Sequence, residues 1–103
     1  MTATTRRHDD WLREQLADDE FMLAYLQSAL EESTSEAEVL MAIRAVVESR
    51  GISRVAEQAG VKRESLSRAL SATGNPRLDT LFGVFKALGF RLSVTKEHDH
   101  AHA

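Results

Sequence analysis

The segment from Ile52 to Ser71 most constrains the fold, because it has the pattern of two short helices separated by a tight turn. Two helices that cross steeply need a small residue where their backbones approach, and Ala56 occupies that place. Gly60 follows four residues later and accepts the positive φ that a chain leaving a helix often adopts. The segment therefore predicts a helix-turn-helix, a unit that places its second helix in the major groove of DNA.

Apolar and polar side chains separate cleanly on the two predicted helices. The inward positions carry Val55, Ala59, Val61, Leu66 and Ala69. The outward positions of the second helix carry Lys62, Arg63, Glu64, Ser67 and Arg68. One side of the pair thus suits a core, and the other offers cations and hydroxyls to a polar partner.

The net charge of −3 conceals two differently charged halves. Residues 1–50 hold five arginines against eleven acidic residues, a net −6, whereas residues 51–103 hold eight lysines or arginines against five acidic residues, a net +3. The positive excess coincides with the predicted helix-turn-helix and suits the phosphates of double-stranded DNA. The acidic half suits a basic protein partner, with plain solvated helix faces as the alternative.

Length and composition exclude several classes of function. A chain of 103 residues forms one small domain without room for a deep catalytic cavity, and it contains no nucleophile-base arrangement or phosphate loop. It has no cysteine, which excludes disulfides and suits a reducing cytoplasm. No apolar run approaches the roughly 20 residues that span a bilayer. We therefore expect a cytoplasmic protein that is not an enzyme, needs no cofactor and does not enter a membrane.

The other helices are predicted from a 3.6-residue apolar period and from capping residues. A flexible arm (1–8) precedes an N-terminal helical extension (9–32), which divides near Asp18 into two short helices. A longer helix runs from Ser35 to Arg50, with Met41 widening its core stripe, and a last helix begins after Gly74-Asn75-Pro76. The expected core residues of the last helix are Leu78, Leu81, Phe82, Phe85 and Leu88. The fold class is all-α, a small bundle of the lambda-repressor-like helix-turn-helix type in one domain (9–96).

The last part of the chain changes period. Phe90, Leu92 and Val94 alternate with polar residues, as in a half-buried strand, so a short C-terminal strand is predicted over 90–96. A lone strand needs a partner, which favours pairing with its copy in a two-fold homodimer; addition to a partner's sheet and a tail packed on the last helix are the alternatives. We expect residues 97–103 to form a disordered tail, whose His98, Asp99, His100 and His102 lack the spacing of a structural metal site, and no metal is assigned.

Four motifs go beyond periodicity: Tyr25-Leu-Gln-Ser-Ala-Leu-Glu-Glu32, Gly60-Val-Lys-Arg-Glu-Ser-Leu66, Gly74-Asn-Pro-Arg-Leu-Asp-Thr-Leu81 and Lys86-Ala-Leu-Gly-Phe-Arg-Leu-Ser-Val94. Through them the chain resembles the addiction-module antidote family, the HigA-like antitoxins with a Cro/C1-type helix-turn-helix, over roughly residues 9–96. The resemblance implies an antitoxin of a type II toxin-antitoxin module. Such a protein binds a small basic toxin of the RelE/HigB type and represses its own operon.

Two positions depart from the family pattern. Lys62 stands where Ser is usual, and a lysine cannot accept the backbone N–H bond with which Ser caps a helix. Ser67 stands where an aromatic Tyr is common, which alters what the helix touches. We therefore expect a shift toward phosphate attraction and an operator sequence that differs from those of relatives.

The residues expected to contact DNA are Arg54, Lys62, Arg63, Ser65, Ser67, Arg68 and Arg77. Arg63 and Arg68 would read guanine, and the cations near helix starts would meet phosphates; exposed salt bridges are the alternative for each arginine. A homodimer predicts a palindromic operator with half-sites about 10 base pairs apart.

The residues proposed to anchor the toxin are Trp11, Leu12, Phe21, Tyr25 and Leu26, with core packing as the alternative. Two other functions remain compatible with the sequence. One is a stand-alone Cro-type repressor without a toxin, and the other is a protein-interaction module whose helix-turn-helix has lost its affinity for DNA.

Overall fold

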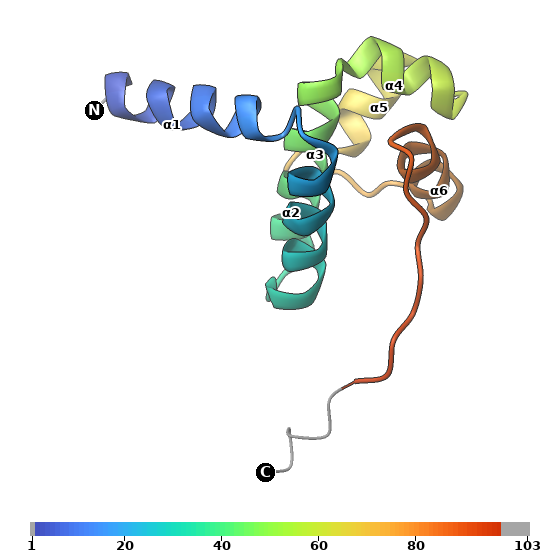
Figure 1. Cartoon of the computed structure of the whole chain (residues 1–103). Helices are drawn as coiled ribbons and strands as arrows, with labels where there is room; N and C mark the ends of the chain where they lie inside the picture. Colours follow the sequence, from blue (N-terminus) through green and yellow to red (C-terminus); the bar gives the residue numbers. More distant parts are fainter. Residues whose placement is uncertain (1, 98–103) are drawn as a thin grey trace.

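The computed structural model describes residues 2–97, which form six α-helices and no β-strand (Figure 1). The helices are α1 (Thr2–Gln15), α2 (Asp19–Glu32), α3 (Glu36–Arg50), α4 (Ile52–Ala59), α5 (Arg63–Ala69) and α6 (Leu78–Ala87). The all-α class is confirmed for this part of the chain, while the lambda-repressor-like type stays a prediction. None of these helices combines the length and the apolar character that a membrane crossing demands.

Short polar side chains begin α2 and α3, as the sequence indicates. The Asp18 carboxylate accepts a bond from the Glu20 N–H at 2.9 Å, and the Ser35 hydroxyl accepts one from the Glu38 N–H at 3.2 Å. The Glu38 carboxylate in turn accepts a bond from the Thr34 N–H at 3.0 Å. These bonds satisfy backbone donors that have no partner inside a helix, and so they fix where α2 and α3 start.

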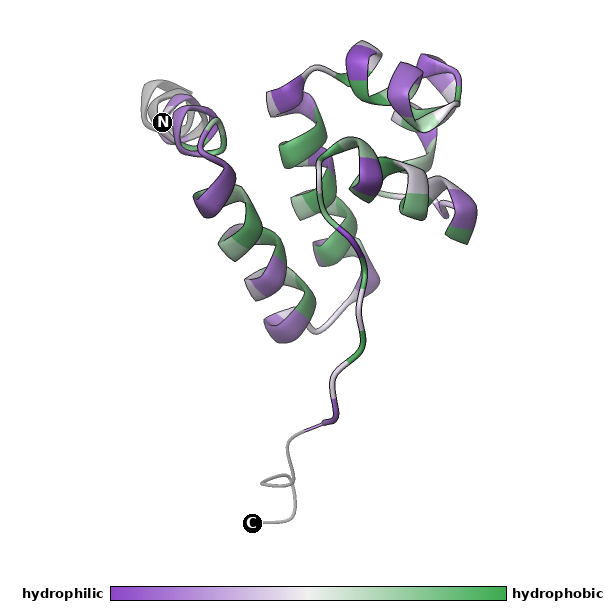
Figure 2. Cartoon of the chain, turned by 45° about the vertical axis from the view of Figure 1, so that its right-hand side comes forward, coloured by the Kyte–Doolittle hydropathy of each residue, from purple (hydrophilic) through white to green (hydrophobic). Residues whose placement is uncertain are grey.

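The core is built around α3, which packs against α2 on one side and against α4 on the other. Val46 and Val47, in the middle of α3, are completely buried. Figure 2 shows hydrophobic segments along both α2 and α3, which run side by side. The other buried core residues are Leu16, Met22, Leu26, Ile43, Val55, Ala56, Leu66, Leu70, Val84, Phe85 and Leu88. One continuous core therefore joins the N-terminal helices to the α4–α5 pair.

The first helix starts earlier than the sequence indicated. Residues 2–8, expected as a flexible arm, form the first part of α1, which extends away from the other helices (Figure 1). Thr2 to Gln15 contain neither glycine nor proline, so nothing in this stretch breaks the backbone hydrogen-bond ladder. The helix start that was expected at residue 9 therefore lies inside α1.

Three residues expected in the core are exposed. Met41 on α3 is 68% exposed, and Leu78 and Phe82 on α6 are 65% and 52% exposed. Leu78 and Phe82 lie on the exposed side of α6, and Met41 lies at a shallow hollow that α3 forms with α2. The helical period predicts which residues share a face of the helix, but it does not predict how much of that face neighbouring helices cover.

The C-terminal segment is extended but forms no strand within the described residues. Phe90 and Leu92 pack against the core of their own chain, and Val94 is 96% exposed. The sequence left three arrangements open for this segment: pairing with a second copy, addition to a partner's sheet, and packing on the last helix. In the single chain, Phe90 and Leu92 adopt the packed arrangement. Pairing of this segment with a second copy stays a prediction, and the histidines at 98, 100 and 102 lie outside the described residues.

Candidate nucleic-acid interface and partner surface

The turn between α4 and α5 depends on Gly60. This residue has a φ of 76°, in the left-handed region that glycine adopts without steric cost. The Gly60 N–H bonds to the Glu57 carbonyl at 3.2 Å, and the Val61 N–H bonds to the Ala56 carbonyl at 3.0 Å. These bonds terminate α4 in a Schellman-type cap, and Val61 packs against the core. The turn that Gly60 predicts is confirmed, and it sets the direction of α5.

The first turn of α5 lacks a side-chain cap. Lys62 occupies the N-cap position with φ −74° and ψ 145°, and its side chain makes no capping hydrogen bond. An ammonium group can only donate, so it cannot satisfy the free backbone N–H groups at this end. The N-terminus of α5 therefore exposes backbone donors beside an exposed cation.

Replacing Lys62 with Ser is expected to stabilise the protein by about 1 kcal/mol, because the hydroxyl can accept one of these N–H bonds. For a domain of this size, that corresponds to a rise in Tm of about 4–8 °C. Thermal unfolding followed by circular dichroism measures it. Lys96→Ser, which removes an exposed lysine from the extended C-terminal segment, is the matched control and should leave Tm unchanged. Equal melting of K62S and wild type would contradict the capping argument.

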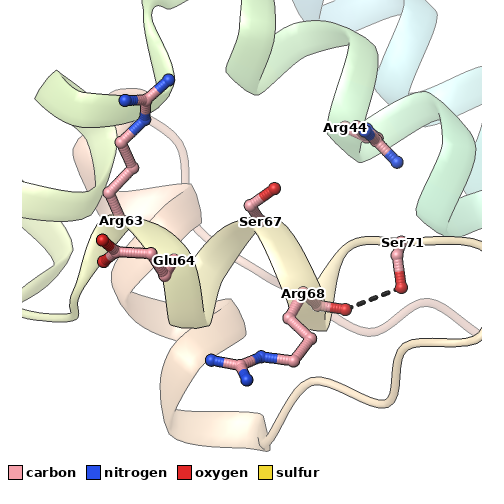
Figure 3. Close-up of a pocket in the computed structure, with 6 residues that line it drawn as sticks. All are labelled: Arg44, Arg63, Glu64, Ser67, Arg68 and Ser71. Atoms are coloured by element: carbon pink, nitrogen blue, oxygen red, sulfur yellow. Dashed lines mark hydrogen bonds between the residues drawn. The ribbon is translucent and has the colours of Figure 1, made fainter.

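Three arginines gather around one shallow hollow of about 420 Å³ (Figure 3). The hollow is lined by Arg44, Arg63, Glu64, Ser67, Arg68 and Ser71. In Figure 3, Arg63 and Arg68 extend in different directions from the two ends of α5, with Ser67 between them. Of the residues predicted to contact DNA, Arg63, Ser67 and Arg68 thus line one hollow.

The remaining predicted contacts lie outside this hollow. Arg54, Lys62 and Ser65 are exposed on or next to α4 and α5. Arg77, directly before α6, lies with its Nε 3.4 Å from the Asp79 carboxylate, and both side chains are largely exposed. In the isolated chain Arg77 therefore forms the exposed salt bridge that was considered as the alternative to a DNA contact. An exposed ion pair of this kind contributes little stability, so a phosphate can compete for Arg77.

Arg44 was missed by the sequence analysis. It lies on α3, and its Nε is 3.0 Å from a Glu48 carboxylate oxygen one helical turn away. Its position at the hollow depends on how α3 packs against the rest of the bundle, which no local pattern specifies. The net negative charge of residues 1–50 also gives no indication that one arginine in this half lies at a basic surface.

A ladder of aromatic rings runs from α1 to α2. The Trp11 and Phe21 ring centroids are 6.2 Å apart in an edge-to-face arrangement, and Phe21 and Tyr25 are stacked at 6.2 Å. His8 continues the ladder beyond Trp11, also at 6.2 Å. Trp11 is 50% exposed, whereas Phe21 and Tyr25 are partly buried against the core. Burial raises the pKa of the Tyr25 phenol above its ordinary value.

The ladder divides the predicted partner-binding residues into two kinds. Trp11, Phe21 and Tyr25 keep part of their rings accessible, and Leu12 is partly buried beside them. Leu26 is only 3% exposed, because it lies on the side of α2 that faces the bundle. Core packing, the alternative considered for Leu26, is thus its observed role, and it offers no surface to a partner.

Exposed carboxylates share α1 and α2 with the aromatic ladder. Asp10, Glu14, Asp18 and Glu20 are all exposed on or beside α1 and α2. Asp19 is held in an ion pair by Arg50 of α3, and Arg13 lies 3.8 Å from Asp10. Exposed aromatic rings with a negative rim suit a partner that carries apolar side chains within a basic surface.

These features define a small all-helical protein with a basic face on α5 and an aromatic, acidic surface on α1 and α2. The chain belongs to the family described as probable addiction module antidote proteins, whose model matches residues 7–96. It is also similar to an uncharacterized protein of Haemophilus influenzae, with 36% identity over 91 residues that cover 88% of this chain and 93% of the relative. No solved structure matches it. Family membership indicates an antitoxin of a toxin-antitoxin module.

Proposed function

We propose that this antitoxin neutralises a small basic toxin of the RelE/HigB type by direct binding and represses its own operon by binding DNA. The observation that carries the proposal is the separation of two surfaces of opposite character in a chain of the antidote family. Arg44, Arg63 and Arg68 line one hollow beside α5, whereas aromatic rings and carboxylates share the surface of α1 and α2. Each surface suits one of the two partners.

In this proposal α4 and α5 act as a helix-turn-helix, and α5 enters the major groove. Arg63 and Arg68 are free of the ion pairs found among the described residues, so their guanidinium groups are available to guanine O6 and N7. Arg54, Lys62 and Arg77 would contact phosphates, with the exposed N-terminus of α5 adding backbone donors. Ser65 and Ser67 would make the weaker contacts.

Footprinting on the DNA upstream of the protein's own reading frame tests this half of the proposal. A protected, palindromic site is expected, with affinity that falls steeply as salt rises, because neutralised phosphates release counterions. A complete lack of binding at low salt would reject DNA repression and would favour a protein-interaction module.

For toxin neutralisation we propose the aromatic ladder as the docking surface, with Trp11 as its anchor. Half of the Trp11 side chain is exposed in the free protein, and burying such a ring at the centre of an interface commonly dominates affinity. The carboxylates around it would steer a basic protein toward this surface.

Trp11→Ala is expected to weaken toxin binding by about 2 kcal/mol or more, roughly a 30-fold rise in Kd. The toxin is first obtained by affinity capture from the native host, and Kd is then measured by isothermal titration calorimetry. Val94→Ala truncates an exposed apolar side chain on the C-terminal segment, away from the ladder residues, and is the control. An unchanged Kd for a folded W11A variant would exclude Trp11 as the anchor, and capture of no partner would favour a stand-alone repressor.

A further inference from the structure

The last helix has an exposed face that the fold does not explain. All exposed residues of α6 lie on it: Leu78, Asp79, Phe82 and Lys86. We call these four residues the α6 outer face. Leu78 and Phe82 are more than half exposed, and together with Arg77 and Asp79 they line a shallow hollow of about 500 Å³. A large leucine and a phenylalanine adjacent on one helix face are costly to leave in water.

The rest of α6 already packs within its own chain. Val84 and Phe85 are buried in the core, and Gly83 lies so close to α4 that an added Cβ would be 3.3 Å from the Ala59 Cβ. A helix that is apolar on two sides needs a covering surface on each. Within the described chain only one of these sides is covered.

The charges on the α6 outer face indicate what covers the other side. Asp79 lies in the first turn of α6 and Lys86 in the last, with Phe82 between them and Leu78 directly before Asp79. Two such faces in antiparallel contact would set each Asp79 near Lys86 of the other copy and would bring the apolar residues together. A parallel contact would oppose like charges. This arrangement is self-complementary under a two-fold axis, as a symmetric dimer interface requires.

We infer that the α6 outer face is the contact between two copies of this chain in a two-fold homodimer, with the two α6 helices antiparallel. The interface therefore differs from the strand pairing that the sequence suggested for residues 90–96. The inference rests on the proposed function, because binding to a palindromic operator requires a two-fold dimer. It is tested on the protein alone, so its failure is distinguishable from failure to bind DNA.

Phe82→Ala is the first test, because Phe82 is half exposed and its truncation leaves the core intact. Sedimentation equilibrium over a concentration series should show a dimer for the wild type and a dimer Kd raised about 30-fold or more for F82A. Met41→Ala, an equally apolar change on α3, should leave the dimer Kd unchanged.

Charge exchange is the second test and probes whether the charged ends of the two α6 outer faces meet in the dimer. Asp79→Lys gives an outer face that is positive at both ends, and Lys86→Glu gives one that is negative at both ends. Each variant alone should dimerise about tenfold more weakly, and an equimolar mixture of the two should form a heterodimer as tight as the wild-type dimer. Circular dichroism checks that both variants fold.

Three outcomes would overturn the inference. One is a wild-type chain that stays monomeric over the whole series, and another is an F82A variant that dimerises like wild type. The third is a mixture of D79K and K86E that associates no better than either alone. Loss of the dimer in Val94→Asp, with F82A unaffected, would assign the contact to the C-terminal segment.

Discussion

Replacing Arg63 with Gln is expected to weaken binding to the operator by about 1–3 kcal/mol, roughly 5- to 150-fold in Kd. Arg63 starts α5 and lines the hollow on the basic face, without an ion pair among the described residues. Glutamine keeps a polar group but is shorter than arginine and cannot donate the bidentate pair that a guanidinium offers to guanine. The loss should therefore be larger for the operator than for unrelated DNA, and fluorescence anisotropy with both DNAs measures it.

Arg91→Gln is the control for this experiment, because Arg91 is an exposed arginine outside α5. The variant should change neither the affinity for the operator nor the salt dependence. An equal loss of affinity for operator and unrelated DNA in R63Q would assign Arg63 to a phosphate contact. Unchanged binding of R63Q to both DNAs would remove Arg63 from the interface.

Replacing Gly74 with Ala is expected to destabilise the protein by about 3 kcal/mol. An added Cβ at this position would overlap the Ala69 carbonyl oxygen and would lie 2.7 Å from the Arg68 carbonyl oxygen, both at the end of α5. Backbone atoms cannot move aside as a flexible side chain can, so the loop after α5 or the end of the helix must shift. Urea denaturation measures the loss of stability.

Operator affinity should fall with stability in G74A, because a shift at the end of α5 moves Arg68 and Ser71. Thr73→Ala, a change at the exposed neighbouring position, should keep both stability and affinity close to wild type. A G74A variant as stable as wild type would show that the loop relaxes without cost.

Local patterns predicted the elements that local forces determine. Gly60 has the positive φ that its position after Ala59 indicates, and Asp18 and Ser35 cap helices because their short polar side chains reach nearby N–H groups. Lys62 likewise fails to cap α5, as its chemistry requires. These outcomes depend on a few adjacent residues, and so the sequence was sufficient.

Features that depend on packing were not predictable in the same way. Phe82 and Met41 follow the apolar period of their helices, but no neighbouring helix covers them. Gly74 was expected only to help form a turn, whereas its contact with the end of α5 also requires the absence of a side chain. Arg44 joins the basic hollow through the packing of α3, far from α5 in sequence.

The position of α3 between α2 and α4 has a consequence for how the two proposed activities combine. The aromatic ladder and α5 belong to different helices around one continuous core, so a toxin bound to the ladder need not cover the exposed face of α5. A basic toxin would, however, cover carboxylates of a chain whose net charge is −3. The complex would then repel the DNA phosphates less than the free antitoxin does, and its affinity for DNA would be higher. Repression would therefore respond to the ratio of toxin to antitoxin through long-range electrostatics alone.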